Sequence, residues 1–371
     1  MNIANVVDVL DRIAPPAYAE DWDNVGLLVG DARRPCRRVM LCIDLTTAAL
    51  VEARRAKAQL VMAYHPVIFK PLARVTAAAS AVVYDAVRAG IAVHSVHTAF
   101  DSAVGGANDA LADALGMSAP RKPLAPHSAA GGYKVAVFVP ATDLAAVSAA
   151  AFRAGAGKIG RYTECAFGVE GVGTFRPDDA ARPTVGRRRR REHASEIRWE
   201  FVCPRSALAT VLTAVRAAHS YEQPAIDVSE LIDAPQGVGL GRVGPLKRPV
   251  QLDTILRRVR TVCGVRRLQL AQPRGARANR KIATLAVGCG SCGRLFRDAV
   301  AAGADLYVTG ELRHHDAAAA VAGGLTVACV GHSNSERLTL NVLARRLRAA
   351  LPCLKVFRAS SRADADPFEI V

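Results

Sequence analysis

Histidines and carboxylates follow several apolar stretches of this chain at the points where those stretches end. Residues 60–65 end in His65, and residues 91–97 end in His97, with Asp101 shortly after it. In the last third, the apolar residues 325–330 are followed by His332 and Glu336. Imidazole nitrogens and carboxylate oxygens together suit zinc, iron, manganese or cobalt, and a carboxylate can bridge two ions. These residues predict a divalent-metal site.

Each of these residues also has a purely structural interpretation. His65 precedes Pro66 and can be a turn residue. Ser333 and Glu336 have the spacing of a capping box, in which both side chains bond backbone N–H groups at the start of a helix. His94 and His97 lie on opposite faces of one predicted strand, so at most one of them naturally faces a site.

A glycine-rich turn is the second feature with chemical potential. Residues 288–293 read Gly-Cys-Gly-Ser-Cys-Gly, between a predicted strand and a predicted helix. Backbone N–H groups of such a turn can hold a phosphate, which makes Gly290 and Ser291 candidates for anion binding. Glu311 lies near the offset of about 20 residues expected of a ribose-binding acid. A packing turn, dinucleotide binding and redox chemistry of the C-x-x-C pair (Cys289 and Cys292) are the alternatives.

The elements that must position these residues are strands alternating with helices. Apolar runs predict strands at 38–44, 60–65 and 91–97, with helices at 46–57, 77–89 and 106–115. The pattern resumes with strands at 282–287, 305–309, 325–330 and 354–358. Such alternation predicts parallel sheets covered by helices, and ligands gather at the carboxyl ends of parallel strands. The fold class is therefore α/β, with two similar α/β lobes.

A smaller domain is expected between the two lobes. Prolines at 120, 123 and 126 mark a boundary, after which strands and helices follow in the order of a ferredoxin-like α+β domain. We predict a first lobe at 1–125, an inserted domain at 130–245 and a second lobe at 246–371.

Composition excludes several classes of protein. Of the 371 residues, 51% are hydrophobic and 22% are charged, which is a globular composition. No apolar run approaches the roughly 20 residues of a membrane span. The net charge is +16, but the arginines are scattered and only 5% of residues are aromatic, so we expect no nucleic-acid partner. The arginine run at 187–191 is interpreted as a solvated loop, with a localisation signal or an anionic contact as alternatives.

The cysteines and the first residues indicate where the protein works. Nine cysteines without framework spacing argue against a disulfide scaffold, and Asp8 and Asp11 interrupt the first apolar stretch. We expect a cytoplasmic protein, with the nucleus as a second location.

Taken together, several short motifs resemble the NIF-three-like family, the NGG-interacting-factor proteins whose bacterial members are labelled GTP cyclohydrolase homologues. They are Asp23-Asn24-Val25-Gly26-Leu27, Tyr64-His65-Pro66, His97-Thr98 with Asp101, Gly290-Ser291, Thr309-Gly310-Glu311, Tyr221-Glu222-Gln223-Pro224-Ala225, Gly331-His332 with Glu336, and Asp366-Pro367. The likeness runs nearly end to end, and the Tyr64 and His332 segments look closest to eukaryotic members.

The resemblance implies a two-lobed α/β fold that assembles as a homohexameric ring, with a dinuclear metal site between the lobes. His65, Asp101 and Glu336 would hold one metal, and His332 with bridging Glu336 the second. His97 would be a ligand or a supporting partner. Many bacterial members have a histidine where this chain has Tyr64, and a neutral phenol, with a pKa of about 10, is a poor ligand at neutral pH. The number of metals per subunit is therefore one or two.

Three functions follow from these observations. The first is a metal-dependent hydrolase acting on a nucleotide or pterin-like small molecule, with His97 or His315 as general base and Gly290-Ser291 at a phosphate. The second is a metal-stabilised scaffold or a partner of transcription proteins, without catalysis. The third is an oxidoreductase, which depends only on the glycine-rich turn.

Overall fold

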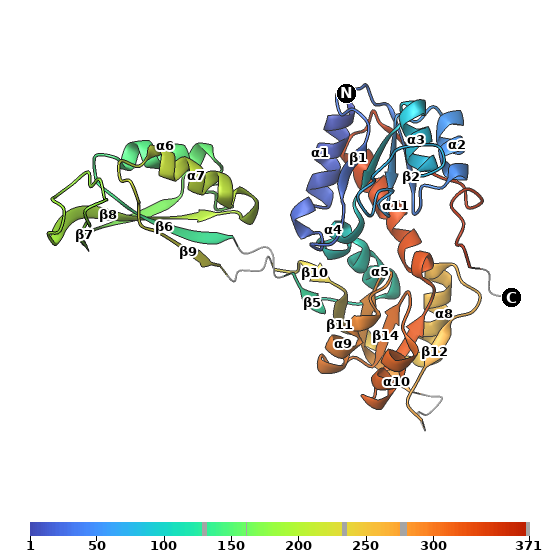
Figure 1. The fold of residues 1–371 in the computed structure, drawn as a ribbon. Helices are drawn as coiled ribbons and strands as arrows, with labels where there is room; N and C mark the ends of the chain where they lie inside the picture. Colours follow the sequence, from blue (N-terminus) through green and yellow to red (C-terminus); the bar gives the residue numbers. More distant parts are fainter. Residues whose placement is uncertain (128–131, 161, 232–235, 275–279, 369–371) are drawn as a thin grey trace. The chain divides into compact units, whose positions relative to one another are not determined.

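The computed structural model describes residues 1–127, 132–160, 162–231, 236–274 and 280–368. The chain divides into two compact units: unit 1 contains Met1–His127 and Gln236–Val371, and unit 2 is the segment Ser128–Pro235. Within these described residues, unit 1 holds two five-stranded sheets and a short two-stranded one, and unit 2 holds one four-stranded sheet (Figure 1). In the part of the chain that the structure describes, no helix is both long and apolar enough to cross a membrane.

The first sheet of unit 1 has the strand order β1-β4-β3-β2-β16, and all pairs except β1 with β4 are parallel. Its strands are β1 (Gly26–Val29), β2 (Arg38–Cys42), β3 (Leu60–Ala63), β4 (Ala92–Ser95) and β16 (Lys355–Arg358). The helices of this lobe are α1 (Ile3–Ile13), α2 (Thr47–Arg55), α3 (Ala81–Ala89), α4 (His97–Ser102) and α5 (Ala107–Leu115), with a 3-10 turn at Pro16–Tyr18.

The second sheet of unit 1 has the order β11-β13-β14-β15-β12, with a parallel centre (β13, β14, β15) and antiparallel edges. Its strands are β11 (Arg242–Gln251), β12 (Gln269–Ala271), β13 (Lys281–Gly288), β14 (Leu306–Thr309) and β15 (Thr326–Cys329). Its helices are α8 (Leu252–Cys263), α9 (Phe296–Ala301, after a 3-10 turn at Gly293–Leu295), α10 (His314–Ala322) and α11 (His332–Ala350). Strands β5 (Ala125–Pro126) and β10 (Gly239–Leu240) pair separately.

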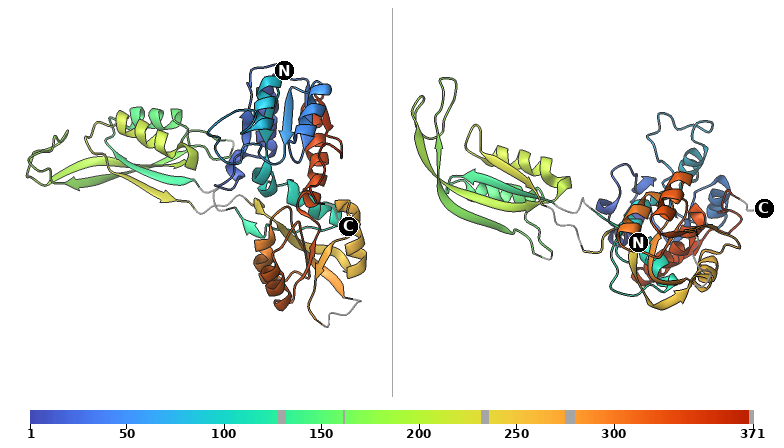
Figure 2. Two further views of the ribbon diagram at one scale, coloured as in Figure 1. Left: turned by 45° about the vertical axis from the view of Figure 1, so that its right-hand side comes forward. Right: turned by 90° about the horizontal axis from the view of Figure 1, so that it is seen from below.

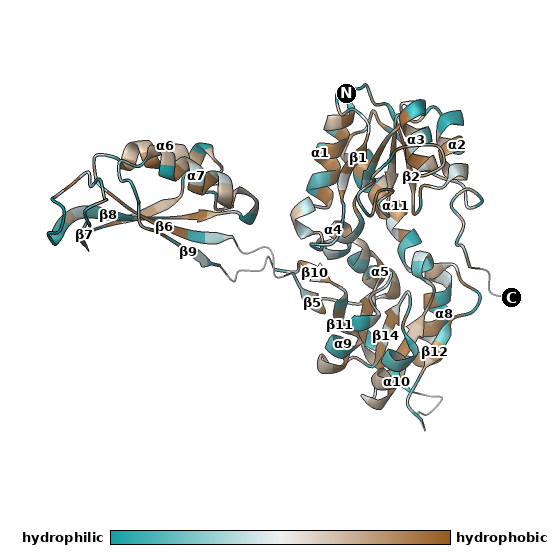
Figure 3. Cartoon of the chain, in the orientation of Figure 1, coloured by the Kyte–Doolittle hydropathy of each residue, from teal (hydrophilic) through white to brown (hydrophobic). Residues whose placement is uncertain are grey.

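One apolar core connects the two sheets. Leu41 of β2 and Leu285 of β13 belong to one core cluster, together with residues of α1, α5, α8 and α11. Because side chains alternate across a strand, the residues next to them point to the opposite face of each sheet. On the opposite faces, Met40 packs with α2 and α3, while Ala286 packs with α9 and α10. Figure 3 shows apolar colours along the strands of both sheets. Burial on both faces explains why these strands read as continuous apolar runs in the sequence.

Unit 2 has the ferredoxin-like arrangement. Strands β6 (Tyr133–Val139), β7 (Ala166–Phe175), β8 (Glu192–Cys203) and β9 (Ile226–Glu230) form an antiparallel sheet in the order β7-β8-β6-β9. Helices α6 (Leu144–Arg153) and α7 (Leu208–Ala218) pack on one face, as the two views of Figure 2 show; a 3-10 turn at Arg205–Ala207 precedes α7. The arginine run lies between β7 and β8; it is exposed, and Arg189 pairs with Asp179.

The α/β fold class with a small inserted domain is confirmed, but two details differ from expectation. Strand β16 pairs with β2, so the last strand joins the first sheet and α11 leads from the second sheet back to it. In addition, unit 2 ends at Pro235, so that β10 and the start of β11, which the sequence assigned to the insert, belong to unit 1. The division into lobes at 1–125 and 246–371 stays a prediction.

Candidate metal centre

The candidate site lies where strands of both sheets of unit 1 end. Asp44, His65 and His97 follow β2, β3 and β4 of the first sheet. Glu311 and His332 follow β14 and β15 of the second sheet. Helix α11 begins at His332, directly after Gly331 with a φ of 91°, and this places Glu336 one turn later on the same face. The carboxyl ends of both sets of parallel strands therefore supply the polar side chains, as expected.

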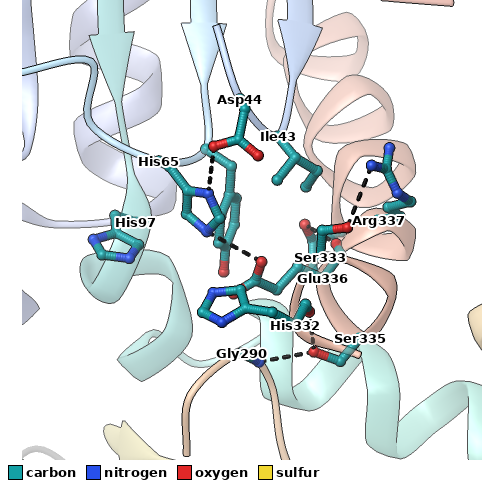
Figure 4. A network of polar contacts seen from close by, with 12 residues as sticks. Ile43, Asp44, His65, His97, Gly290, His332, Ser333, Ser335, Glu336 and Arg337 are labelled. Atoms are coloured by element: carbon teal, nitrogen blue, oxygen red, sulfur yellow. Dashed lines mark hydrogen bonds and ion pairs between the residues drawn. The ribbon is translucent and has the colours of Figure 1, made fainter. Parts of the chain in front are cut away.

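His65, His332 and Glu336 form a compact set of ligand atoms. One atom from each of the three side chains lies within 4.8 Å of the others. Nε2 of His65 is 3.2 Å from Oε2 of Glu336, and Nε2 of His332 is 3.4 Å from Oε1 of the same carboxylate. Each oxygen of Glu336 therefore faces one imidazole, and the Glu336 side chain is buried, with 2% of it exposed (Figure 4).

Each of the three imidazoles at the site is oriented by a carboxylate that contacts its Nδ1 atom. Nδ1 of His65 is 2.9 Å from Asp44, Nδ1 of His332 is 2.5 Å from Glu311, and Nδ1 of His97 is 2.8 Å from Asp23. Pairing of Nδ1 with an acceptor leaves Nε2 as the free ring nitrogen, which is the usual arrangement around metal-ligating histidines. Burial would raise the pKa of Asp23, but hydrogen bonds from His97 and Thr98 hold this pKa below its usual value.

The residues fit a divalent cation on three observations. Nε2 of His65 and Oε2 of Glu336 are buried without a hydrogen-bond partner, although they are close together. Their separation is what two ligands at about 2.1 Å from one ion require. Burial opposes a positive charge on His65, yet Asp44 and Glu336 outweigh it and raise its pKa to about 10. The same negative charges favour a metal cation at this position.

Gly290 provides the third observation, because it makes room for the ligands. A Cβ atom at Gly290 would lie 2.3 Å from Oε1 of Glu336 and 3.4 Å from Nε2 of His332, and the residue has a φ of 66°. Its N–H donates to Oγ of Ser335 at 2.8 Å, so this N–H already has a partner. Ser291 lines the cavity, and its predicted contact with a phosphate stays a prediction.

Asp101 reaches the site but is held by a neighbour. It is buried, lines the same cavity as the three clustered ligands, and accepts a hydrogen bond from the hydroxyl of Tyr64. Burial and the nearby Glu336 raise the pKa of Asp101 to about 7. The Tyr64 ring is fully buried and directs its phenol to Asp101.

A cavity of about 670 Å³ opens above the ligands. His97 lines it, and the His65 ring lies 5.3 Å from the His97 ring and 5.3 Å from the His332 ring, measured between centroids. His315, the other predicted general base, is exposed on α10 and is not among the described residues that line this cavity. The structure therefore brings together the predicted residues His65, His97, Asp101, Gly290, Ser291, His332 and Glu336, but not His315.

One structural interpretation from the sequence is wrong. Ser333 is not a helix cap: the capping position of α11 is Gly331, without a side-chain bond, and the Ser333 hydroxyl donates to Asp366 at 2.6 Å. Glu311 contacts Nδ1 of His332, and the ribose-binding role that its offset suggested stays a prediction. Cys289 and Cys292 line the cavity as buried thiols, and burial raises the pKa of both.

Sequence reasoning missed the supporting role of three carboxylates. Asp44 is the last residue of the first strand that the sequence predicts, and Asp23 begins one of the motifs, so both positions carried a signal. Their pairing with His65 and His97 depends on tertiary contacts that local periodicity does not contain.

Fold and site together define a class: a two-lobed α/β protein with a candidate divalent-metal centre at the carboxyl ends of its parallel strands. The family model of Duf34/NIF3 (NGG1p interacting factor 3) matches residues 1–367. The chain belongs to this family.

Relatives and solved structures of similar length support this assignment. A "GTP cyclohydrolase 1 type 2 homolog" of Halalkalibacterium halodurans is 32% identical, with 100% of both chains covered. The protein of the same name from Mycobacterium leprae is 38% identical over 85% of this chain and 81% of its own. The Bacillus cereus protein related to NIF3 is 31% identical, with a TM-score of 0.69 over 100% of this chain and 99% of that one. Staphylococcus aureus protein SA1388 shares the fold, with a TM-score of 0.76 at 24% identity and coverage of 100% and 99%.

Proposed function

We propose that the protein is a metal-dependent hydrolase acting on a nucleotide or pterin-like small molecule. The observation that carries the proposal is the set of His65, His332 and Glu336, whose ligand atoms lie within 4.8 Å at the base of a cavity. A purely structural metal site has no need of a cavity of about 670 Å³ beside it. The relatives are named after a GTP cyclohydrolase, which supports this class of substrate.

His65, His332 and Glu336 would hold the metal, and Asp101 is a further ligand if Tyr64 releases it. Zinc, iron, manganese and cobalt all suit this mixed nitrogen and oxygen set. We expect one or two ions per subunit. A divalent metal bound here would supply Lewis acidity and lower the pKa of water toward neutrality.

The remaining residues have roles that follow from their contacts. Asp44 and Glu311 fix the ring orientation of His65 and His332 through Nδ1. His97 is not part of the compact ligand set, and Asp23 holds its Nδ1, so its Nε2 is available to accept a proton from water in the cavity. We therefore assign His97 as the general base.

The test begins with metal analysis of protein purified without chelators. We expect metal near one or two equivalents per chain, and turnover of nucleoside triphosphates or pterins that stops with chelator and returns with metal. His97→Ala should retain metal and lose turnover, while His315→Ala, on exposed α10, should change neither. Tightly bound metal without turnover of any of these substrates would contradict the hydrolase and leave the metal-stabilised scaffold.

We also propose that the chain assembles with copies of itself, as a hexamer. On β7, Phe167, Val169 and Val172 are 63%, 50% and 69% exposed, and exposed apolar side chains of this kind often mark interfaces. Light scattering should give about six times the 39.2 kDa chain mass, and a 39.2 kDa particle would contradict the proposal.

A further inference from the structure

Two exposed aromatic rings stand at the candidate metal cavity without a role in the apolar core. Trp22 is 54% exposed and Phe69 is 49% exposed, and both line the cavity. Their ring centroids are 5.8 Å apart, and the Trp22 ring is also 5.9 Å from the ring of His97. Neither aromatic residue belongs to a core cluster of the described chain. Exposure of two large aromatic residues beside a polar cavity points to a ligand that covers them.

The loops that carry these two rings are fixed to one another. Nδ2 of Asn24 donates to the carbonyl oxygen of Ile68 at 2.5 Å, which joins the Trp22 loop to the residue before Phe69. Asp23 accepts a hydrogen bond from the Thr98 N–H at 3.1 Å, so the loop is also tied to α4. The aromatic pair is therefore held in place before any ligand arrives, which lowers the entropy lost on binding.

Arg294 adds a positive charge to the same cavity. Among the described residues that line it, Arg294 has the only permanently positive side chain, and that side chain is 67% exposed. It lies 3.3 Å from Glu20, whose own N–H donates to Thr98 at 3.0 Å. The acidic side chains that line the cavity, Asp101 and Glu336, are carboxylates at the candidate metal centre, so Arg294 is the side chain that can pair with an anionic group of a ligand.

We propose that Trp22, Phe69 and Arg294 form a binding subsite for a planar heteroaromatic ring that carries an anionic group. The ring stacks on the Trp22–Phe69 pair, and the anion pairs with Arg294. The subsite rests on the proposed function, because it supplies the part of substrate recognition that the metal ligands do not. A nucleotide and an anionic pterin share this chemistry.

Intrinsic fluorescence offers a direct test, because the chain has two tryptophans and Trp199 is buried in unit 2. In a Trp199→Phe background, Trp22 is the only tryptophan reporter. Titration of the metal-loaded protein with guanosine monophosphate should quench Trp22 in a saturable manner. Guanosine, which lacks the anion, should bind about tenfold more weakly. Ribose phosphate, which lacks the ring, should not quench. A parallel titration with a carboxylated pterin distinguishes the nucleotide from the pterin, because the preferred ligand saturates the quenching at the lower concentration.

Matched variants assign the effect to the proposed side chains. Phe69→Leu keeps an apolar side chain but removes the ring, and should lower the affinity for guanosine monophosphate about fivefold or more. Leu72→Ala, in the same segment and outside the cavity lining, should not. Arg294→Gln should weaken the binding of guanosine monophosphate about tenfold and leave the binding of guanosine unchanged. Arg297→Gln, which changes an exposed arginine on α9 outside the cavity lining, should affect the binding of neither.

The outcomes separate this inference from the proposed hydrolase. Saturable quenching that depends on Phe69 and Arg294, without turnover, supports the subsite and contradicts the hydrolase. Absence of quenching by every probe, or equal affinities in Phe69→Leu, Arg294→Gln and the parent, overturns the subsite even if turnover is found.

Discussion

The two sheets of unit 1 supply the same kind of residue to the candidate metal centre, but they hold it differently. Side chains of His65 and His97, after strands of the first sheet, are 21% and 14% exposed, and the Asp23 side chain that supports His97 is fully buried. His332, after a strand of the second sheet, is 36% exposed, and its partner Glu311 is 54% exposed. The imidazoles that follow strands of the first sheet are therefore more buried than the one that follows a strand of the second.

Glu336 connects the two halves of the site. Its side chain is 2% exposed, on a helix that starts at the second sheet and leads to the last strand of the first. Water and salt weaken interactions between exposed charges far more than between buried ones. Among the metal ligands and the carboxylates that orient them, we expect changes at the buried residues to affect metal binding most, and changes at the more exposed His332–Glu311 pair to affect it least.

Neutralising Glu336 is the change with the largest expected effect, because it removes the carboxylate that faces both His65 and His332. Glu336→Gln keeps the side-chain length but presents a neutral amide, which cannot balance a divalent ion. Metal content should fall to background. The stabilisation by bound metal, about 2.7 kcal/mol at a hundredfold excess over Kd, should vanish from the thermal melt with it.

Glu20→Gln is the control for that experiment, since it neutralises a carboxylate that contacts cavity-lining Arg294 without belonging to the ligand set. It should retain metal. Full metal content in Glu336→Gln, with a melt that chelator does not move, would show that His65, His332 and Glu336 do not form a metal centre.

Substitution of the supporting carboxylates compares the two halves of the metal centre directly. Asp44→Asn and Glu311→Gln each leave an imidazole ligand in place but weaken its orientation through Nδ1. Loss of such a partner costs roughly ten- to a hundredfold in metal affinity. We expect Asp44→Asn within that range and Glu311→Gln at or below its lower end, because the Glu311–His332 pair is more exposed. Competition with a fluorescent chelator measures both, and a larger effect at Glu311 would reverse the comparison.

Gly290→Ala tests how closely the second lobe approaches the ligands. The new methyl group would meet Oε1 of Glu336, so metal affinity should fall by about tenfold, in addition to a backbone cost of about 1 kcal/mol at positive φ. Gly303→Ala is a matched control, because Gly303 has a φ of 69° and nothing within 4 Å of an added Cβ. It should lose the same stability in a denaturant titration but retain metal affinity. Equal metal affinities in the two variants would show that the approach of Gly290 is unimportant.

Sequence periodicity predicted the parallel strands well, because both faces of each sheet are buried and the strands read as apolar runs, as in residues 60–63. It could not predict that β16 pairs with β2, since periodicity says nothing about which strands are neighbours. It also missed β7, whose glycines and exposed side chains give no apolar alternation.

The candidate site, too, was predicted only in part from the sequence. Placement after parallel strands was enough to select His65, His332 and Glu336 as candidates. The run 91–97 was predicted to be a strand throughout, whereas β4 ends at Ser95 and His97 begins α4, which turns His97 toward Asp23. The aromatic pair Trp22 and Phe69 gave no periodic signal, because both residues lie in loops outside any strand or helix.

The smallest expected change in metal binding concerns Tyr64, which is fully buried in the half of the site that the first sheet supplies. Its hydroxyl donates to Asp101, and its fully buried ring offers no ligand at neutral pH. Tyr64→His removes that donor and adds an imidazole, so the metal content per chain should rise if the phenol keeps a second ion out. Tyr64→Phe is the control, because it removes the hydroxyl without adding a ligand; it should leave the metal content unchanged and cost about 1–3 kcal/mol for the buried Asp101 that loses its donor. Metal analysis after identical loading compares the two variants. Metal content equal to that of the parent in both variants would mean that Tyr64 does not limit the number of metals, and that the site takes the same number of ions with or without a histidine at this position.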